Sequence, residues 1–432
     1  MALRLSQKQA DFSARFDELL SQKREASSDV SSTVRSILSD VASRGDEAVL
    51  EYTATFDRLE ISAEEIRITP EEIHNARSTV EDKTIEALQL AHDRIFAHHS
   101  RQLPKDDRYT DALGVELGSR WTAVESIGLY VPGGTASYPS SVLMNAVPAK
   151  VAGVERIVMV VPTPDGEIQP LVLVAADMAG VDEIYRIGGA QAVAALAYGT
   201  NTIDPVVKIV GPGNAFVAEA KRQVFGTVGI DMIAGPSEVL IIADHENDPD
   251  WVAADLLAQA EHDTAAQSIL ITNNETFATQ VELCVKNQLK TLPRSEIATK
   301  SWEDFGAIIT VDDIKESAAL ANKIAAEHLE IMTANPDDIF EKIHNAGAVF
   351  LGRYTPEAIG DYVGGSNHVL PTSRSARFSS GLSVLDYMKR TSILRCGSEQ
   401  LQAIGGAAQR LAEVEGLEAH RKSVAIRGNA NK

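Results

Sequence analysis

The first hundred residues of the chain carry apolar positions at helical spacing. Such residues recur every three or four positions over 32–44, 46–56 and 69–100, as is typical of helices that bury one face. The longest of these ranges is interrupted or bent near Val80. Little of the alternation expected of strands occurs there, so we expect a helical N-terminal region.

From Glu125 onward, short β-branched runs alternate with amphipathic segments. Strand and helix signals that alternate in this way predict parallel sheets joined by crossover helices. Two such sets follow one another, so we expect an α/β fold with two successive Rossmann-like domains. The predicted strands cover 127–131, 157–161, 183–187, 206–210, 238–243, 268–272 and 306–311, and the predicted helices 142–152, 169–178, 191–198, 214–225, 250–262, 276–289 and 314–327.

Beyond about residue 385 the pattern predicts helix again, over 399–413 and then from Gly416 toward His420. It indicates a small helical C-terminal extension.

Parallel sheets bind ligands beyond the carboxyl ends of their strands, so the expected site is a cleft between the two α/β units. The predicted division is a discontinuous first α/β domain of residues 25–125 and 238–384, a second α/β domain of residues 126–237, and small helical extensions of residues 1–24 and 385–432.

Composition narrows the class of protein. The 432 residues include 61 Asp and Glu against 40 Lys and Arg, a formal net charge of −21. Since no basic run is present to release counterions, we expect no binding to nucleic acid. The N-terminus lacks the apolar core of a secretory signal, and apolar runs such as 157–161 are too short to span a bilayer, so we expect a cytoplasmic protein. Cys284 and Cys396 lack Cys-x-x-Cys spacing, which argues against a disulfide framework and a thiolate zinc site.

Four residues in distinctive surroundings could bind a metal ion. Gln259 and His262 are three positions apart in a helix-like run and would share one helix face. Asp361 follows Gly360 in a glycine-rich stretch, and His420 ends the sequence EGLEAH. Two imidazoles, a carboxylate and an amide oxygen suit zinc. Taken singly, each residue has a plainer interpretation as a polar helix edge, a turn cap or an exposed side chain.

Glu327 and His328 place an acid beside a base on a predicted helix. Histidine can accept the hydroxyl proton of an alcohol near neutral pH, and a neighbouring carboxylate can activate water. The alternative is a solvated helix face. A separate segment, Gly211-Pro212-Gly213-Asn214, begins like a dinucleotide-binding fingerprint but lacks its third glycine. It is read equally well as a glycine turn with Asn214 as a helix N-cap.

Several longer motifs occur in one order along the chain, and together they resemble the histidinol dehydrogenase family. The resemblance extends from about residue 25 to residue 427. The motifs are 128–134 (GLYVPGG), 211–217 (GPGNAFV), 231–232 (DM), 234–240 (AGPSEVL), 366–372 (SNHVLPT) and 379–384 (SSGLSV).

The resemblance implies an activity, two cofactors and an assembly. It implies NAD-dependent oxidation of L-histidinol to L-histidine through L-histidinaldehyde, the last step of histidine biosynthesis, with one Zn²⁺ per subunit that holds the substrate. It also implies an intertwined homodimer in which His420 and Glu415 serve the neighbouring subunit, although the sequence leaves open whether they act in cis or in trans. A dehydrogenase of the same family acting on another small polar alcohol is the alternative. A catalytically silent metal-binding protein would lack Glu327 or His328, and both are present.

The resemblance also assigns a role to each candidate residue. Glu327 and His328 would be catalytic, and the second α/β domain would bind NAD. The implied zinc ligands are Gln259, His262, Asp361 and His420; the NAD contacts are Tyr130, Gln191 and Asn214; and the substrate contacts are Ser237, Gln259, His262, His328, Asp361, His368, Glu415 and His420.

Overall fold

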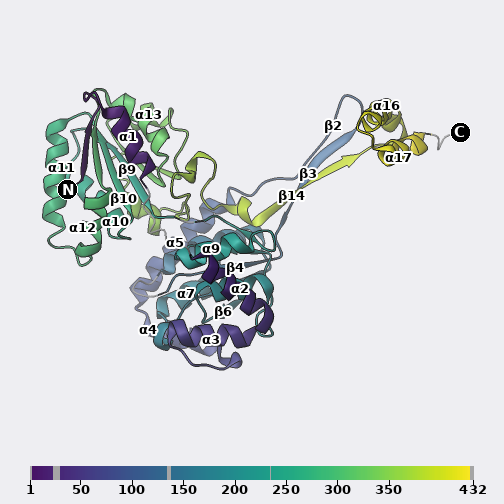
Figure 1. Cartoon of the computed structure of the whole chain (residues 1–432), viewed down its shortest axis with the longest axis horizontal. Helices are drawn as coiled ribbons and strands as arrows, with labels where there is room; N and C mark the ends of the chain where they lie inside the picture. Colours follow the sequence, from purple (N-terminus) through teal and green to yellow (C-terminus); the bar gives the residue numbers. More distant parts are fainter. Residues whose placement is uncertain (1, 23–29, 134–137, 234, 429–432) are drawn as a thin grey trace.

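The computed structural model describes residues 2–22, 30–133, 138–233 and 235–428. The motif residues Gly134 and Ala234 lie outside this described part, as do positions 25–29 of the predicted first domain. Figure 1 shows two α/β lobes and an arm that projects away from them. We call the lobe with the larger sheet the first lobe and the other the second lobe.

The second lobe contains a five-stranded parallel sheet with strand order β6-β5-β4-β7-β8. Helices connect successive strands, so the predicted alternation is confirmed here. The strands are β4 (Ser126–Tyr130), β5 (Arg156–Val160), β6 (Glu183–Tyr185), β7 (Lys208–Val210) and β8 (Gly229–Ile230), and the helices are α6 (Pro139–Ala152), α7 (Pro170–Met178), α8 (Gly189–Tyr198) and α9 (Ala215–Val224).

The first lobe contains a six-stranded parallel sheet with strand order β1-β11-β10-β9-β12-β13. Its strands are β1 (Leu3–Ser6), β9 (Glu238–Ala243), β10 (Gln267–Thr272), β11 (Ala307–Thr310), β12 (His328–Met332) and β13 (Ala348–Leu351). Its helices are α1 (Phe12–Ser21), α10 (Pro249–Ala260), α11 (Glu275–Gln288), α12 (Ser295–Phe305), α13 (Ser317–Ile324), α14 (Pro336–Phe340) and α15 (Glu357–Tyr362).

The helix predicted over 314–327 is wrong at its C-terminal end. Helix α13 stops at Ile324 because Ala325 adopts a left-handed backbone conformation with φ +52°. Glu327 then precedes β12, and His328 is the first residue of that fully buried strand. The acidic Glu330 in the middle of the strand interrupts the run of apolar residues although it is itself buried, so no hydrophobic pattern marked the strand.

The N-terminal helices α2 (Ser31–Arg44), α3 (Asp46–Asp57), α4 (Pro70–Thr79) and α5 (Asp82–Ser100) form as predicted, with the break at Val80. They pack against the second lobe: α2 buries its apolar face on α8, and α5 lies on α6. This packing differs from the predicted grouping of residues 25–125 with 238–384. The predicted extension 1–24 differs too, since β1 pairs with β11 inside the larger sheet. Periodicity shows that a helix has an apolar face but not which surface covers it.

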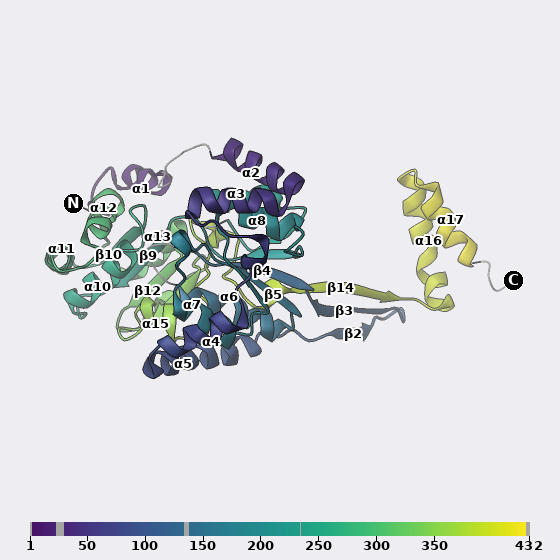
Figure 2. The same ribbon diagram turned by 90° about the horizontal axis from the view of Figure 1, so that it is seen from below.

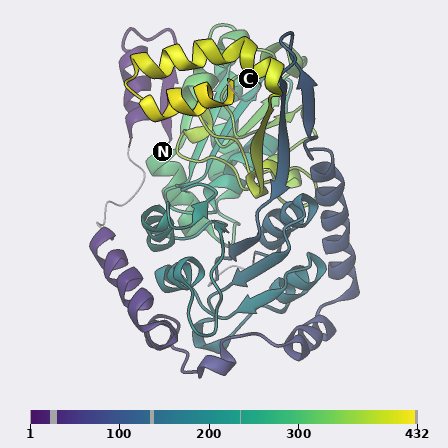
Figure 3. The same cartoon turned by 90° about the vertical axis from the view of Figure 1, so that its right-hand side faces the viewer.

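The arm is a three-stranded antiparallel sheet that carries two helices at its tip (Figures 1 and 2). Strands β2 (Asp107–Thr110), β3 (Glu116–Ala123) and β14 (Met388–Arg395) form it, and α16 (Ser398–Val414) and α17 (Glu418–Gly428) follow. Figure 3 shows the two helices side by side. The expectation of helix throughout residues 385–432 is therefore wrong for β14, whose mostly exposed residues show no alternation. In the described part of the chain, no helix is both long and apolar enough to span a bilayer.

A buried histidine ties α5 and α6 to the segment that follows α15. His99 Nδ1 donates to the carbonyl oxygen of Ile95 at 2.8 Å, and its Nε2 lies 3.4 Å from Asn367 Nδ2. Asn367 also donates to the carbonyl oxygen of Met144 at 2.6 Å. Burial lowers the pKa of His99 to about 4, because the charged imidazolium would lose its hydration.

This shift predicts a pH-dependent stability. Between the ordinary pKa of about 6.5 and the folded value of about 4, the unfolded chain binds a proton that the folded protein does not, so stability falls as the pH falls through that window. Replacing His99 by Gln should reduce the loss of unfolding free energy between pH 7 and pH 5 by about 2 kcal/mol. Urea unfolding at both pH values measures this. His98→Gln, at an exposed position of the same helix, is the control, and an identical pH dependence in both variants would contradict the prediction.

Candidate active site

A cleft of about 520 Å³ lies between the two lobes and takes its walls from both. The second lobe contributes Pro132 and Gly211, which follow the carboxyl ends of β4 and β7. The first lobe contributes Ser237 and His328, which lie at the amino ends of β9 and β12. The expectation of a cleft between two α/β units is met, but only one sheet offers its carboxyl edge. In the other sheet the polar residues precede the buried strands.

The carboxyl edge of the smaller sheet also holds the three residues predicted to contact NAD. Tyr130 is buried, and its hydroxyl accepts the N–H of Gly189 at 3.0 Å. Gln191 is buried too, and its Oε1 has no hydrogen-bond partner among the described residues. Asn214 caps α9, because its Oδ1 accepts the N–H groups of Phe216 and Val217 at 3.1 Å each. The plainer interpretation of Asn214 as an N-cap is thus confirmed.

Three predicted metal ligands, Gln259, His262 and Asp361, line the cleft. Ligand atoms of His262 and Asp361 lie within 4.8 Å of each other and of a carboxylate oxygen of Glu357. Gln259 adds an amide oxygen beside them, with its Oε1 3.1 Å from His328 Nδ1. An imidazole, carboxylates and an amide oxygen are a donor set that suits Zn²⁺ or a similar divalent cation. Glu357 was not predicted, although its spacing of four residues from Asp361 places both on one face of α15.

The prediction that Gln259 and His262 share a helix face is wrong in its local detail. Helix α10 ends at Ala260, and His262 lies in the turn that follows. Its backbone N–H bonds to the carbonyl oxygen of Gln259 at 3.2 Å, so the turn still brings the two residues together. Solvent reaches His262 from the open cleft, while the surrounding protein lowers its pKa and the Asp361 carboxylate opposes that shift.

The position and the protonation state of His328 are those that a general base requires. Its Nδ1 lies 3.1 Å from Gln259 Oε1 and 3.2 Å from the carbonyl oxygen of Glu238, so the Nδ1 proton is held on that side. Its Nε2 has no hydrogen-bond partner among the described residues and lies 4.0 Å from Asp361 Oδ1. Burial lowers the pKa of His328, and Asp361 opposes this only in part. The imidazole is therefore neutral near pH 7, with its Nε2 lone pair available.

Two carboxyl groups flank this imidazole. Glu327 Oε2 accepts the N–H of Glu238 at 3.1 Å and lies 3.8 Å from His328 Nδ1. Glu357 Oε2 lies 3.7 Å from the same nitrogen. Burial raises the pKa of Glu357 well above its ordinary value, and nearby Glu330 and Asp361 raise it further.

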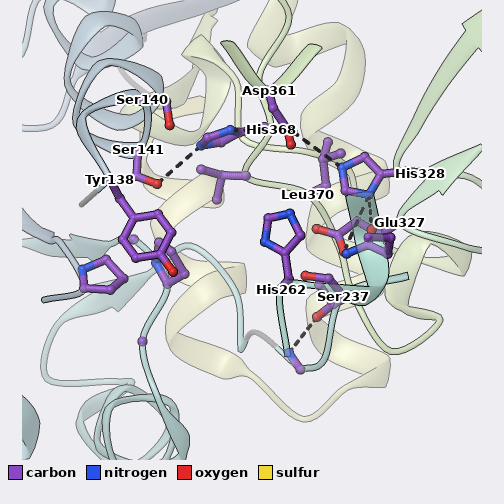
Figure 4. Close-up of a pocket in the computed structure, with 18 of the residues that line it drawn as sticks. Tyr138, Ser140, Ser141, Ser237, His262, Glu327, His328, Asp361, His368 and Leu370 are labelled. Atoms are coloured by element: carbon purple, nitrogen blue, oxygen red, sulfur yellow. Dashed lines mark hydrogen bonds and ion pairs between the residues drawn. The ribbon is translucent and has the colours of Figure 1, made fainter. Parts of the chain in front are cut away.

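His368 connects the metal-donor cluster to the second lobe. Its Nδ1 lies 3.7 Å from Asp361 Oδ1, and its Nε2 lies 3.5 Å from Ser141 Oγ in the first turn of α6. Figure 4 shows His262, His328, Asp361 and His368 around the same part of the cleft, with Ser140 and Ser141 on the facing wall. Ser237, the remaining predicted substrate contact from the lobes, also lines the cleft.

The structure does not bring Glu415 and His420 into the cleft of their own chain. Glu415 caps the C-terminus of α16, and His420 lies in α17; both side chains are exposed. These helices lie at the tip of the arm, well away from the lobes (Figures 1 and 2). Other residues that sequence reasoning gave no role, Lys221, Arg294 and Tyr138, do line the cleft.

A neutral imidazole beside carboxyl groups, in a cleft at the carboxyl edge of a Rossmann-like sheet, is an arrangement that suits an α/β oxidoreductase. The histidinol dehydrogenase family model matches residues 20–428. The chain belongs to the histidinol dehydrogenase family.

Relatives support this membership over the full length. The chain is 67% identical to a histidinol dehydrogenase of Brucella suis biovar 1 over 429 residues, which covers 99% of this chain and 100% of the relative. It is 65% identical, with the same coverage, to the one from Nitrobacter winogradskyi. The crystal structure of histidinol dehydrogenase from Elizabethkingia anophelis superimposes with a TM-score of 0.94 at 36% identity, covering 99% of this chain and 98% of that one.

The donor cluster predicts how metal affinity responds to substitution. Asp361→Asn removes the carboxylate of a predicted ligand and should lower the affinity for Zn²⁺ by at least about tenfold, measured by competition with a chelator. Asp263→Asn is the control, because Asp263 is exposed and its Oδ1 only accepts the N–H of Ala265. Unchanged affinity in the Asp361 variant would remove this residue from the ligand set.

Proposed function

We propose that the chain oxidises L-histidinol to L-histidine through L-histidinaldehyde, with reduction of two NAD⁺ and consumption of one water. Family membership makes the protein an oxidoreductase of histidine biosynthesis. The observation that carries the proposal is His328, whose unpartnered Nε2 lies beside the metal-donor cluster.

In the first oxidation, His328 Nε2 removes the hydroxyl proton of the alcohol while the carbon-bound hydrogen leaves as hydride to NAD⁺. One aldehyde, one NADH and one proton result. Low pKa suits His328 to this role, because the imidazole is already neutral when substrate arrives. The adjacent β12–β9 pairing keeps the ring in place through the carbonyl oxygen of Glu238.

In the second oxidation, Glu327 accepts a proton from a water molecule while the oxygen of that water adds to the aldehyde carbon. Hydride then leaves the resulting adduct for a second NAD⁺, which gives the carboxylic acid, and release of its proton to solvent gives the product carboxylate. Glu327 is held in position by the backbone N–H of Glu238. The two oxidations thus use neighbouring residues, His328 in the first and Glu327 in the second, within one site.

The residues that would hold Zn²⁺ are Gln259, His262 and Asp361 of one chain and His420 of the partner subunit. A bound zinc ion offers coordination positions for the imidazole and amine nitrogens of histidinol, which would orient the substrate. Ser237 and His368 are the contacts proposed from the lobes, and Glu415 of the partner subunit would pair with the substrate ammonium.

A dehydrogenase that acts on another small polar alcohol is the second candidate. The cleft favours a cationic amino alcohol over a neutral one, because its acidic lining residues outnumber the basic ones: Asp231, Glu261, Glu327 and Asp361 against Lys221 and Arg294. Growth of a histidine auxotroph on histidinol, with and without this gene, would separate the two.

The reaction is tested by counting NADH per substrate. Purified, zinc-loaded protein with L-histidinol should yield two NADH per molecule consumed, lose activity to a chelator and regain it with Zn²⁺. One NADH per substrate would contradict the second oxidation. Turnover only with a different alcohol would favour the second candidate.

The proposed exchange of arms between subunits predicts complementation. Mixing Glu327→Gln with His420→Asn subunits should restore activity, because a mixed dimer contains one site with both residues intact. After random mixing, about half of the dimers are mixed, and each mixed dimer has one intact site of its two. The expected activity is therefore about a quarter of the parent activity.

Mixing Glu327→Gln with His328→Asn is the control, because these residues lie in the same lobe and no mixed dimer would have an intact site. No recovery in the first mixture, with mixed dimers demonstrated by differential tags, would favour sites built from one chain.

A further inference from the structure

A buried ion pair lies beside the glycine turn in the wall of the cleft. Lys221, in the second half of α9, pairs with Asp231, which follows β8. Their side chains are 3% and 1% exposed, so both charges are removed from bulk water. In such surroundings the pair must satisfy its remaining hydrogen-bonding capacity within the protein.

Both members of the pair bind the same glycine. Lys221 Nζ donates to the carbonyl oxygen of Gly211 at 2.8 Å, and Asp231 Oδ2 accepts the N–H of Gly211 at 2.8 Å. Asp231 Oδ1 accepts the N–H of Met232 at 2.6 Å. The backbone of Gly211 is therefore held on both sides of its Cα by opposite charges.

Gly211 is the residue at which the chain leaves β7 and enters the cleft wall. Its φ is +104°, and a Cβ there would overlap the carbonyl oxygen of Tyr130. The turn therefore packs so closely against the end of β4 that a side chain at position 211 would clash with it. Gly211, Pro212 and Gly213 then line the cleft and lead to Asn214 at the N-terminus of α9.

We propose that the Lys221–Asp231 ion pair positions residues 211–214 for the dinucleotide, making Lys221 and Asp231 positioning residues of the oxidation. This inference rests on the proposed use of NAD. A buried ion pair adds little stability compared with apolar residues of similar size, so stability gives no strong reason to keep one. Its distinguishing effect is geometric, because it fixes both hydrogen-bonding groups of a glycine whose backbone would otherwise be the freest in the wall.

The position of the pair predicts which reactant is affected. Lys221, Asp231 and the turn belong to the second lobe, whereas His262, Asp361 and His328 belong to the first. Loosening the turn should weaken the binding of NAD⁺ while leaving the metal and the binding of histidinol nearly unchanged.

Two variants test this against a matched control. Lys221→Met removes the ammonium but leaves Asp231 buried without its cation, so it risks misfolding. The double variant Lys221→Met/Asp231→Asn removes both charges and keeps the interior neutral. Lys150→Met is the control, because Lys150 forms a partly exposed pair with Asp182 at 3.0 Å in the same lobe.

The readouts are the dissociation constant of NAD⁺ by calorimetry, the KM of each reactant and the zinc content. We expect the double variant to raise both the NAD⁺ dissociation constant and the KM for NAD⁺ at least tenfold. The KM for L-histidinol should stay within twofold of the parent, with zinc content equal, and Lys150→Met should match the parent throughout.

An unchanged NAD⁺ dissociation constant in a folded double variant overturns the inference, as does an equal rise in both KM values. If the parent protein itself does not bind NAD⁺, the proposed cofactor is wrong and the inference fails with it. If the parent protein binds NAD⁺ and the double variant binds it equally well, only the positioning role of the ion pair is overturned.

Discussion

The active site depends on the parallel pairing of β12 with β9. Their register sets His328 opposite Val239, so the imidazole lies against the carbonyl oxygen of Glu238 and within 3.1 Å of Gln259. The same junction lets Glu327 accept the N–H of Glu238. A shift of one residue in this pairing would turn both His328 and the apolar residues after it to the opposite faces of the sheet.

Burial then sets the protonation of the groups brought together. Desolvation disfavours the charged form of each, so the pKa of His328 falls while that of Glu357 rises. Because His328 is neutral and Glu357 is protonated, no unpaired charge is buried here. Burying an unpaired ion in a protein costs on the order of several kcal/mol. The cleft stays open to solvent at His262.

The arm imposes a different constraint. Its antiparallel strands carry α16 and α17 away from both lobes, so Glu415 and His420 face solvent in the isolated chain. Exposed apolar residues on these helices, Leu411, Val414 and Ile426, are consistent with contact to another surface. The arm thus keeps Glu415 and His420 away from the cleft of their own chain.

Patterns among neighbouring residues were enough to predict the α/β alternation of the second lobe, most of that of the first and the break near Val80, and they offered the cap at Asn214 as one of two interpretations. The sequence also supplied the motif residues Gln259, His262 and Asp361 that meet in the cleft. Only tertiary structure decided that His328 begins a strand, that Glu357 joins the cluster and that the N-terminal helices cover the second lobe. These depend on which surface buries a given face, and local periodicity does not reveal that an acidic residue such as Glu330 is buried.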